Sequence, residues 1–160
     1  MIKVGEKLPD AQFNVPTLEG MKQMRTDEIF GGKTVALFAV PGAFTPTCSA
    51  RHLPGFRDAA ADLKAKGVDL IACTAVNDHF VMGAWAKDQG VGDDIMMLSD
   101  GSGQFAKALG LDADFSKFGM GTRSKRYSML VKDGVVEKLN VEDAGEYKVS
   151  SAEHLLGQLS

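Results

Sequence analysis

Two short apolar runs, separated by a segment long enough for a helix, most constrain the fold of this chain. The runs are TVALFAV at residues 34–40 and VDLIACTAV at residues 68–76. Runs without alternating polar residues are typical of strands that are covered on both faces of a sheet. A third such run, DIMMLSD at residues 94–100, follows a second helix-length segment. The pattern therefore predicts a sheet whose strands alternate with helices.

The remaining elements are predicted from turn and capping residues. Hairpins are expected over residues 11–26, turning near Glu19-Gly20, and over residues 126–141, turning at Asp133-Gly134. Helices are expected over residues 45–66, ended by Gly67, over 79–90 behind Asn77-Asp78, from Ser102 to Leu109, and from Ser151 onward. This order implies an α/β fold with a central mixed β-sheet and helices on both faces, which fits the thioredoxin-like architecture.

Length and composition indicate one domain over residues 1–160, with 44% apolar and 24% charged residues. A net charge of −3 gives no basic field for a nucleic-acid or membrane partner. The first 13 residues contain no apolar core of a signal peptide, so a cytoplasmic, reducing location is expected. Two cysteines, Cys48 and Cys73, make no disulfide framework and are too few for a zinc site.

Cys48 lies in VPGAFTPTCSARHLPGF, residues 40–56, where a proline-broken loop opens a helix. Thr45 suits the N-cap and Pro46 the first helical position. The unpaired amides of the first turn and the helix dipole favour a thiolate, as an activated nucleophile requires. The alternative is a cysteine that serves as a small buried apolar residue. Position 51 is arginine, so a Cys-x-x-Cys dithiol is excluded.

The segment PGAFTPTCSARHLPGF resembles the active-site loop of the peroxiredoxins of the type five (type II) subfamily. The family pattern Pro-x-x-x-Thr-x-x-Cys falls on Pro41, Thr45 and Cys48. IACTAVNDHFVMGAW and SKRYSMLVKDGVV are also similar to that subfamily, so the resemblance covers almost the whole chain. It implies a thioredoxin fold and the reduction of hydrogen peroxide and alkyl hydroperoxides through a cysteine sulfenic acid, with no metal or organic cofactor.

The resemblance also implies a role for each matching residue. Cys48 is expected to be the peroxidatic cysteine, and Thr45 to hold the peroxide through its hydroxyl. Pro41 is expected to shield the thiolate, and Arg126 to be the active-site arginine. The backbone amides of Gly42 and Cys48 are expected to bind the peroxide.

Other assignments remain open for the basic residues. Arg126 belongs to the stretch TRSKR, and composition alone favours a solvated surface charge there. Only the similarity of KRYSMLV to the family pattern favours an active-site role for it. Arg123 is the competing arginine, although it lies farther from the expected strand. Arg51 and His52 follow Cys48 by about one helical turn, where the first can add positive potential and the second can position the loop or a partner.

The thiol that reduces the oxidised enzyme is predicted from whether the chain carries a resolving cysteine of its own. Cys73 lies inside an expected central strand, which favours a buried core thiol over a resolving cysteine. The C-terminal stretch NVEDAGEYKVSSAEHL, where some members carry a resolving cysteine, contains none. We therefore expect glutathione and glutaredoxin to recycle the sulfenic acid, with thioredoxin as the alternative donor.

Two further expectations concern assembly and the choice of function. The resemblance implies a homodimer formed near the active-site loops, in which Phe44, Phe80 and Phe118 are candidate contacts. A function of another class is a non-enzymatic peroxide sensor or holdase chaperone, which would need no turnover.

Overall fold

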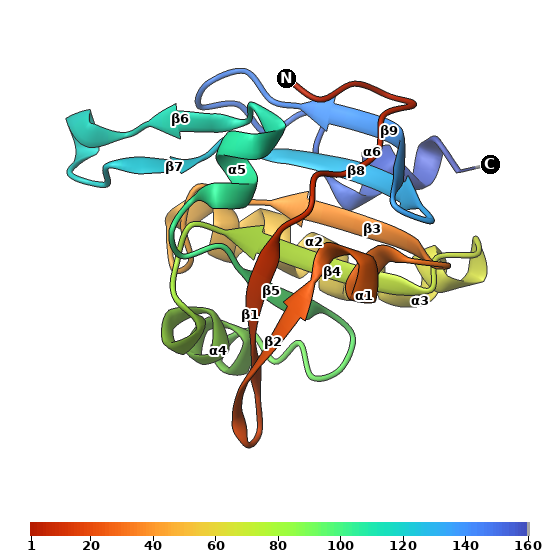
Figure 1. The fold of residues 1–160 in the computed structure, drawn as a ribbon, viewed down its shortest axis with the longest axis horizontal. Helices are drawn as coiled ribbons and strands as arrows, with labels where there is room; N and C mark the ends of the chain where they lie inside the picture. Colours follow the sequence, from red (N-terminus) through yellow and green to blue (C-terminus); the bar gives the residue numbers. More distant parts are fainter. Residues whose placement is uncertain (160) are drawn as a thin grey trace.

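The computed structural model describes residues 1–159. The centre of the fold is a seven-stranded mixed sheet. Its strand order is β2-β1-β5-β4-β3-β8-β9 (Figure 1). The central strands β3 (Thr34–Ala39), β4 (Leu70–Ala75) and β5 (Met96–Ser99) are parallel. The outer strands β1 (Gln12–Thr17), β2 (Gly20–Arg25), β8 (Tyr127–Lys132) and β9 (Val135–Val141) pair antiparallel with their neighbours.

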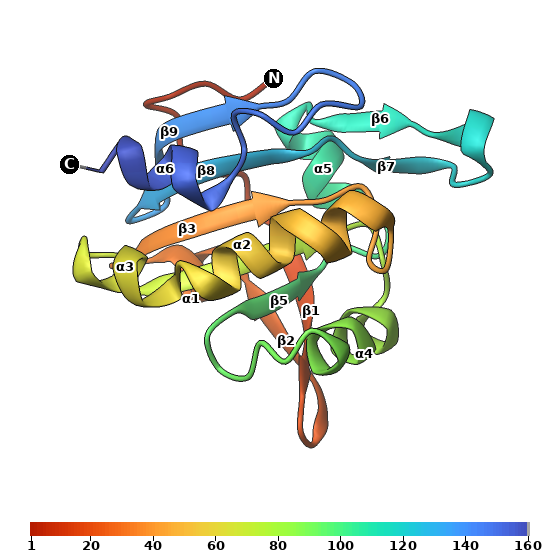
Figure 2. The ribbon, with the colours of Figure 1, turned by 180° about the vertical axis from the view of Figure 1, so that it is seen from behind.

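Helices cover both faces of this sheet, as the apolar runs predicted. On one face lie α1 (Thr26–Phe30) and α5 (Gln104–Leu109), in front of the sheet in Figure 1. On the other lie α2 (Leu53–Asp58), α3 (Ala60–Ala65), α4 (His79–Asp88) and α6 (Ala152–Gly157), in front of it in Figure 2. Alternate residues of β3 enter two separate apolar cores, with Leu37 in one and Phe38 in the other. The predicted α/β fold with a central mixed sheet is confirmed.

The prediction of one continuous helix over residues 45–66 is wrong, because the structure divides this stretch into several segments. After a first turn at residues 46–47, the chain forms a π-helical segment, η1 (Cys48–His52), then α2 and α3, with a break at Ala59. Pro54 gives the physical reason. It has no N–H to donate and its ring crowds the carbonyl four residues earlier, so the preceding turn widens to the i→i+5 pattern. Gly67 follows the last turn with a φ of +98°, as predicted.

Helix caps agree with the sequence at two helices and differ at a third. The Asp78 side chain accepts from the Val81 amide at 2.8 Å at the start of α4, and Ser151 caps α6. Ser102 does not cap α5, because Gly103 occupies the N-cap position. The Asp100 carboxylate instead accepts amides from the first turn of this helix, those of residues 105 and 106, each at 3.0 Å.

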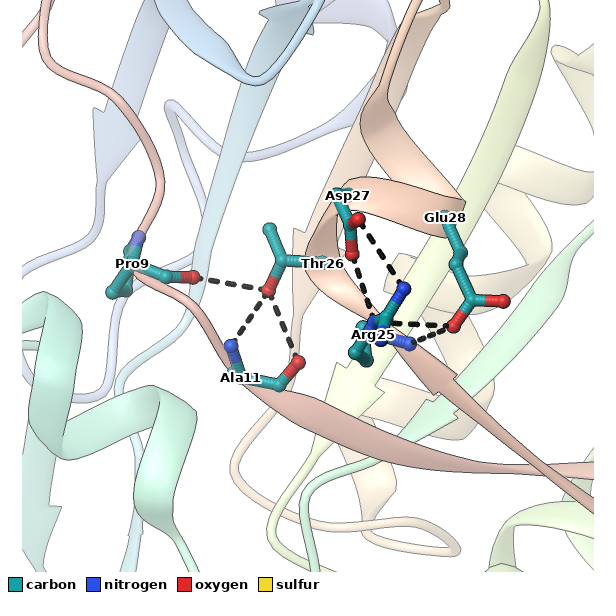
Figure 3. Close-up of polar contacts among 6 residues, drawn as sticks. All are labelled: Pro9, Ala11, Arg25, Thr26, Asp27 and Glu28. Atoms are coloured by element: carbon teal, nitrogen blue, oxygen red, sulfur yellow. Dashed lines mark hydrogen bonds and ion pairs between the residues drawn. The ribbon is translucent and has the colours of Figure 1, made fainter.

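Helix α1 was not predicted, and its polar contacts lie between neighbouring segments of the chain (Figure 3). The Thr26 hydroxyl bridges the Pro9 carbonyl at 3.0 Å and the Ala11 amide at 2.9 Å. The Glu28 carboxylate accepts the Arg25 amide at 3.0 Å. The Thr26 contacts tie the residues before β1 to the end of β2, and the Glu28 contact closes the first turn of α1. The helix is only five residues long, too short for an apolar period to reveal it.

A small hairpin was also missed. Strands β6 (Asp112–Asp114) and β7 (Thr122–Ser124) pair outside the main sheet, with the 3₁₀ turn η2 (Ser116–Phe118) between them. The hairpin projects at the upper left of Figure 1.

Within residues 1–159, no helix combines the length and apolar character that crossing a bilayer requires.

Phe56 provides a test of the core between α2 and the sheet. Its ring stacks on Phe38 with centroids 4.1 Å apart and planes 5° from parallel, and both side chains are fully buried. Phe56→Ala should lower the free energy of unfolding by about 3–5 kcal/mol, measured by urea denaturation. Leu18→Ala, at a fully exposed hairpin tip, is the control and should change it by less than about 0.5 kcal/mol. Similar losses in the two variants would contradict this packing.

Candidate active site

The loop over residues 40–47 turns the chain sharply from β3 into a helix. Phe44 adopts a left-handed φ of +63°, which non-glycine residues rarely adopt, and its side chain is half exposed. The helix begins at Pro46, and the Ser49 amide donates to the Thr45 carbonyl at 2.9 Å. Thr45 therefore has the backbone position of an N-cap, and Pro46 is the first helical residue, as predicted.

The Thr45 hydroxyl points back into the loop instead of capping the helix. It donates to the Gly42 carbonyl at 2.7 Å, which leaves its lone pairs free to accept a hydrogen bond. Gly42 is closely packed, because a Cβ there would lie 3.2 Å from Thr45 Cγ2 and 3.3 Å from Arg123 Nη1, so these side chains would have to shift slightly. The next amide, of Ala43, donates to the Asn77 side chain at 2.9 Å and so fixes the loop to the end of β4.

Cys48 occupies the third helical position, where η1 begins. At this position its amide lacks an i−4 partner within the helix. Its side chain has no exposed surface and joins the apolar core that contains Phe38 and Cys73. A reactant can therefore reach the sulfur only when surrounding side chains move. The polar neighbours of the sulfur decide what chemistry it can do.

Arg126 supplies the charge beside the sulfur. Its Nη2 donates to Cys48 Sγ at 3.1 Å. The antiparallel register of β3 and β8 pairs Ala39 with Tyr127, which brings Arg126 to the edge of the sheet where the cysteine loop begins. A guanidinium keeps its charge at any working pH, so this contact holds a fixed positive charge against the sulfur.

The structure brings Arg126 to the sulfur and places Arg123 elsewhere. Arg123 Nε donates to the Met120 carbonyl at 2.9 Å and its Nη1 donates to the Val76 carbonyl at 3.3 Å, so this side chain joins loops beside Gly42. The third candidate, Arg51, lies over the Tyr147 ring, 4.5 Å from its centroid.

His52 holds the other side of the arginine. Arg126 Nη1 donates to His52 Nδ1 at 2.9 Å, and His52 Nε2 lies 2.9 Å from the Ser150 carbonyl. A carbonyl only accepts, so Nε2 carries the proton and the imidazole is neutral. Burial and the Arg126 charge lower the pKa of His52 from 6.5 to about 3, although the bond to Ser150 opposes this. The sequence indicated a positioning role for His52 but not its partners.

Cys73 lies on β4 and is fully buried and free, as expected for a core thiol. Burial, and then the nearby Cys48, raise the pKa of Cys73 well above its ordinary value. It remains a thiol at neutral pH, which makes it a poor nucleophile.

The sequence did not indicate a role for Trp85 near the site. Its Nε1 donates to Ser49 Oγ at 3.0 Å, next to Cys48 in the chain.

A cavity of about 380 Å³ opens beside this site. Pro41, Thr47 and Arg126 form the part of its wall next to Cys48. The remaining wall combines apolar and charged side chains, which are Ala113, Phe115, Lys125, Glu142, Asp143, Ala144, Gly145 and Glu146. The volume lies in the range of small-molecule sites.

A sheet of this topology that presents one thiol at a helix start, with an arginine on the sulfur, defines a thiol-based redox protein. The family model described as Redoxin matches residues 3–156. The chain is 49% identical to "Peroxiredoxin-2E, chloroplastic" of Arabidopsis thaliana, over 99% of this chain and 69% of that protein. It therefore belongs to the Redoxin family and, within it, to the type five (type II) peroxiredoxins, which are thiol peroxidases.

Solved structures agree with this membership. Reduced Prx3 from Vibrio vulnificus in complex with hydrogen peroxide superposes with a TM-score of 0.96, at 52% identity over 100% of both chains. Peroxiredoxin 5 from Alvinella pompejana gives a TM-score of 0.88 at 34% identity, over 99% of this chain and 98% of that one. The thioredoxin-like fold expected from the sequence is confirmed.

The neutral, buried His52 predicts a pH dependence of stability. Its pKa is about 3 in the folded protein and near 6.5 in an unfolded chain, so the unfolded state binds more protons between these values. Stability from this group is complete above pH 6.5 and falls by about 1.4 kcal/mol per pH unit below it. Between pH 7.5 and pH 5.0 the loss is about 2 kcal/mol. His52→Phe should remove that part of the loss, as measured by urea unfolding at both pH values.

The same measurement on His154→Phe, at an exposed position, gives the reference for removing an imidazole. Equal pH dependence in the two variants would show that His52 is not held neutral by its surroundings.

Proposed function

We propose that Cys48 is the peroxidatic cysteine of a peroxidase that reduces hydrogen peroxide and alkyl hydroperoxides. The observation that carries this proposal is the 3.1 Å contact from Arg126 Nη2 to Cys48 Sγ at the start of a helix. The thiolate attacks one peroxide oxygen, the O–O bond breaks, and the other oxygen leaves as hydroxide or alkoxide. The product is a sulfenic acid. The relative from Vibrio vulnificus was crystallised with hydrogen peroxide, which supports this substrate class.

The surrounding groups suit the charge that develops in this step. Arg126 faces the sulfur and can also polarise the O–O bond, since its fork of donors remains charged. The Thr45 hydroxyl donates to Gly42, so it accepts the peroxide O–H through its lone pairs. The amides of Gly42 and Cys48 act as donors to the peroxide. Pro41 lines the adjoining cavity and shields the thiolate from water.

We propose that glutathione, with glutaredoxin, reduces the sulfenic acid. The high pKa and central-strand position of Cys73 argue against an internal resolving thiol. The adjoining cavity supports a small charged donor, because Lys125 can face a carboxylate, and Asp143 and Glu146 can face an amine. Glutathione carries both kinds of group. Thioredoxin is the alternative donor, and a non-enzymatic peroxide sensor or holdase is the alternative function.

Two further parts of the proposal concern assembly and location. A homodimer near the active-site loops is supported by the exposure of Phe44, Phe80 and Phe118, which is 51%, 76% and 70%. Their segments lie on the left side of Figure 1 and the right side of Figure 2. A cytoplasmic location is consistent with two free thiols, which suit a reducing compartment. The Arabidopsis relative is chloroplastic by its name.

Cysteine variants test the catalytic cycle. Cys48→Ser should abolish peroxide consumption, because a serine hydroxyl is not ionised at neutral pH. Cys73→Ser should retain at least about half the turnover with glutathione and glutaredoxin, since Cys73 takes no part in the proposed cycle. Peroxide consumption is measured for each protein with glutathione plus glutaredoxin and with thioredoxin plus its reductase. Loss of turnover in Cys73→Ser would identify a resolving cysteine, and no turnover with any donor would favour the sensor.

Lys125 tests the cavity as the glutathione site. Lys125→Glu should raise the KM for glutathione about fivefold, equivalent to about 1 kcal/mol, because it reverses the charge opposite a carboxylate. Turnover with uncharged dithiothreitol should change much less. Lys132→Glu makes the same charge change at an exposed position outside the cavity, and is the control. The same KM in both variants would place glutathione elsewhere.

A further inference from the structure

One buried carboxylate oxygen organises the segment over residues 148–150. Glu142 Oε2 accepts the Lys148, Val149 and Ser150 amides at 2.7, 2.9 and 2.8 Å, and the Ser150 hydroxyl at 2.6 Å. Glu142 is 7% exposed and Ser150 is fully buried. Burial raises the pKa of Glu142, but these hydrogen bonds outweigh it and lower the pKa below the ordinary value. The carboxylate is therefore ionised at neutral pH, as four donors on one oxygen require.

This segment presents a carbonyl to His52. With its amide and hydroxyl both directed to Glu142, Ser150 offers its carbonyl to His52 Nε2 at 2.9 Å. The carbonyl fixes the proton on Nε2, and the lone pair on Nδ1 therefore faces Arg126. The His52 ring is also enclosed, with centroid distances of 4.9 Å to Phe38 and 5.3 Å to Tyr147. It cannot rotate away without breaking these contacts.

Glu142 also acts on the arginine backbone. The Glu142 amide donates to the Arg126 carbonyl at 3.0 Å. The same residue thus holds the Arg126 main chain directly and its guanidinium through Ser150 and His52. A long arginine side chain has many rotamers, and the conformation with Nη1 on His52 is the one that places Nη2 against Cys48 in this structure.

We propose that Glu142 is a positioning residue for Arg126, acting through Ser150 and His52 to hold the guanidinium against the Cys48 sulfur. The inference rests on the proposed function of Cys48 and Arg126. Misplacing a group by about 1 Å at a reacting centre can cost about 100-fold in rate. The side chain of Glu142 is thereby linked to peroxide reduction without touching the sulfur.

The test is a double-mutant cycle on the oxidation step alone, without any reductant. The rate constant for the reaction with hydrogen peroxide is measured by stopped-flow fluorescence of Trp85, the only tryptophan, which hydrogen-bonds next to Cys48. Glu142→Gln should lower this rate constant about 10- to 100-fold, because an amide oxygen holds the four donors weakly. Glu153→Gln, the same change at an exposed position on α6, should leave it within about twofold.

The cycle separates positioning from a structural role. In an Arg126→Ala background, Glu142→Gln should have no further effect, since there is no guanidinium left to position. An equal fold-loss in both backgrounds would overturn the inference, as would a wild-type rate for Glu142→Gln or for Arg126→Ala. If Glu142→Gln does not fold, His52→Phe takes its place in the same cycle with the same expected outcome.

The outcome also distinguishes this inference from the proposed function. Absence of a sulfenic acid on Cys48 in the wild-type protein, tested by trapping with dimedone, would overturn both. A wild-type protein that forms the sulfenic acid, with a Glu142→Gln variant that forms it equally fast, would overturn only the role of Glu142. Because no glutathione is present, a contribution of Glu142 to the cavity wall cannot produce the expected loss.

Discussion

The contact between Arg126 and the Cys48 sulfur is the interaction on which the rest of the site depends. A thiolate without exposed surface is costly unless a fixed cation compensates the lost hydration. The two residues are 78 positions apart, and the β3–β8 register brings them together. The neutral state of His52 belongs to the same arrangement, because a protonated imidazole would repel the guanidinium and could not accept its N–H.

Irregular backbone is concentrated where this contact forms. Phe44 has a left-handed φ, and the π-helical segment η1 begins at Cys48 and ends just before α2. A non-glycine residue in the left-handed region costs about 1–2 kcal/mol. Regular elements on both sides, β3 and α2, offset such costs through packed aromatic side chains. Strain of this kind persists where the surrounding structure fixes the chain, and here it surrounds the Cys48 sulfur.

Local chemistry explains what could be predicted from the sequence. Apolar runs predicted β3, β4 and β5, and the Thr45-Pro46 pair predicted the helix start before Cys48, because these signals involve adjacent residues. The π-helical segment was missed although its cause, Pro54, was visible. Helix α1 and the β6–β7 hairpin were too short to show a period.

The contacts around Arg126 could not be predicted from local patterns. His52 lies 74 positions before Arg126 and 98 before Ser150, and nothing near it in sequence identifies those partners. Arg123 and Arg126 are indistinguishable by composition, since both belong to one basic stretch. The strand register separates them, because it directs one arginine to the sulfur and the other to backbone carbonyls.

The two cysteines show why burial alone does not identify a nucleophile. Both side chains are fully buried, both belong to one apolar core, and the sequence offered a core role for each. Cys73 lies within a strand, and its pKa is raised by burial and by the other cysteine. Cys48 lies in the first turn of a helix, and its sulfur accepts a hydrogen bond from the charged guanidinium of Arg126. The proposed difference between the packing thiol and the peroxidatic one therefore lies in the position of one guanidinium, and that position depends on residues distant in sequence.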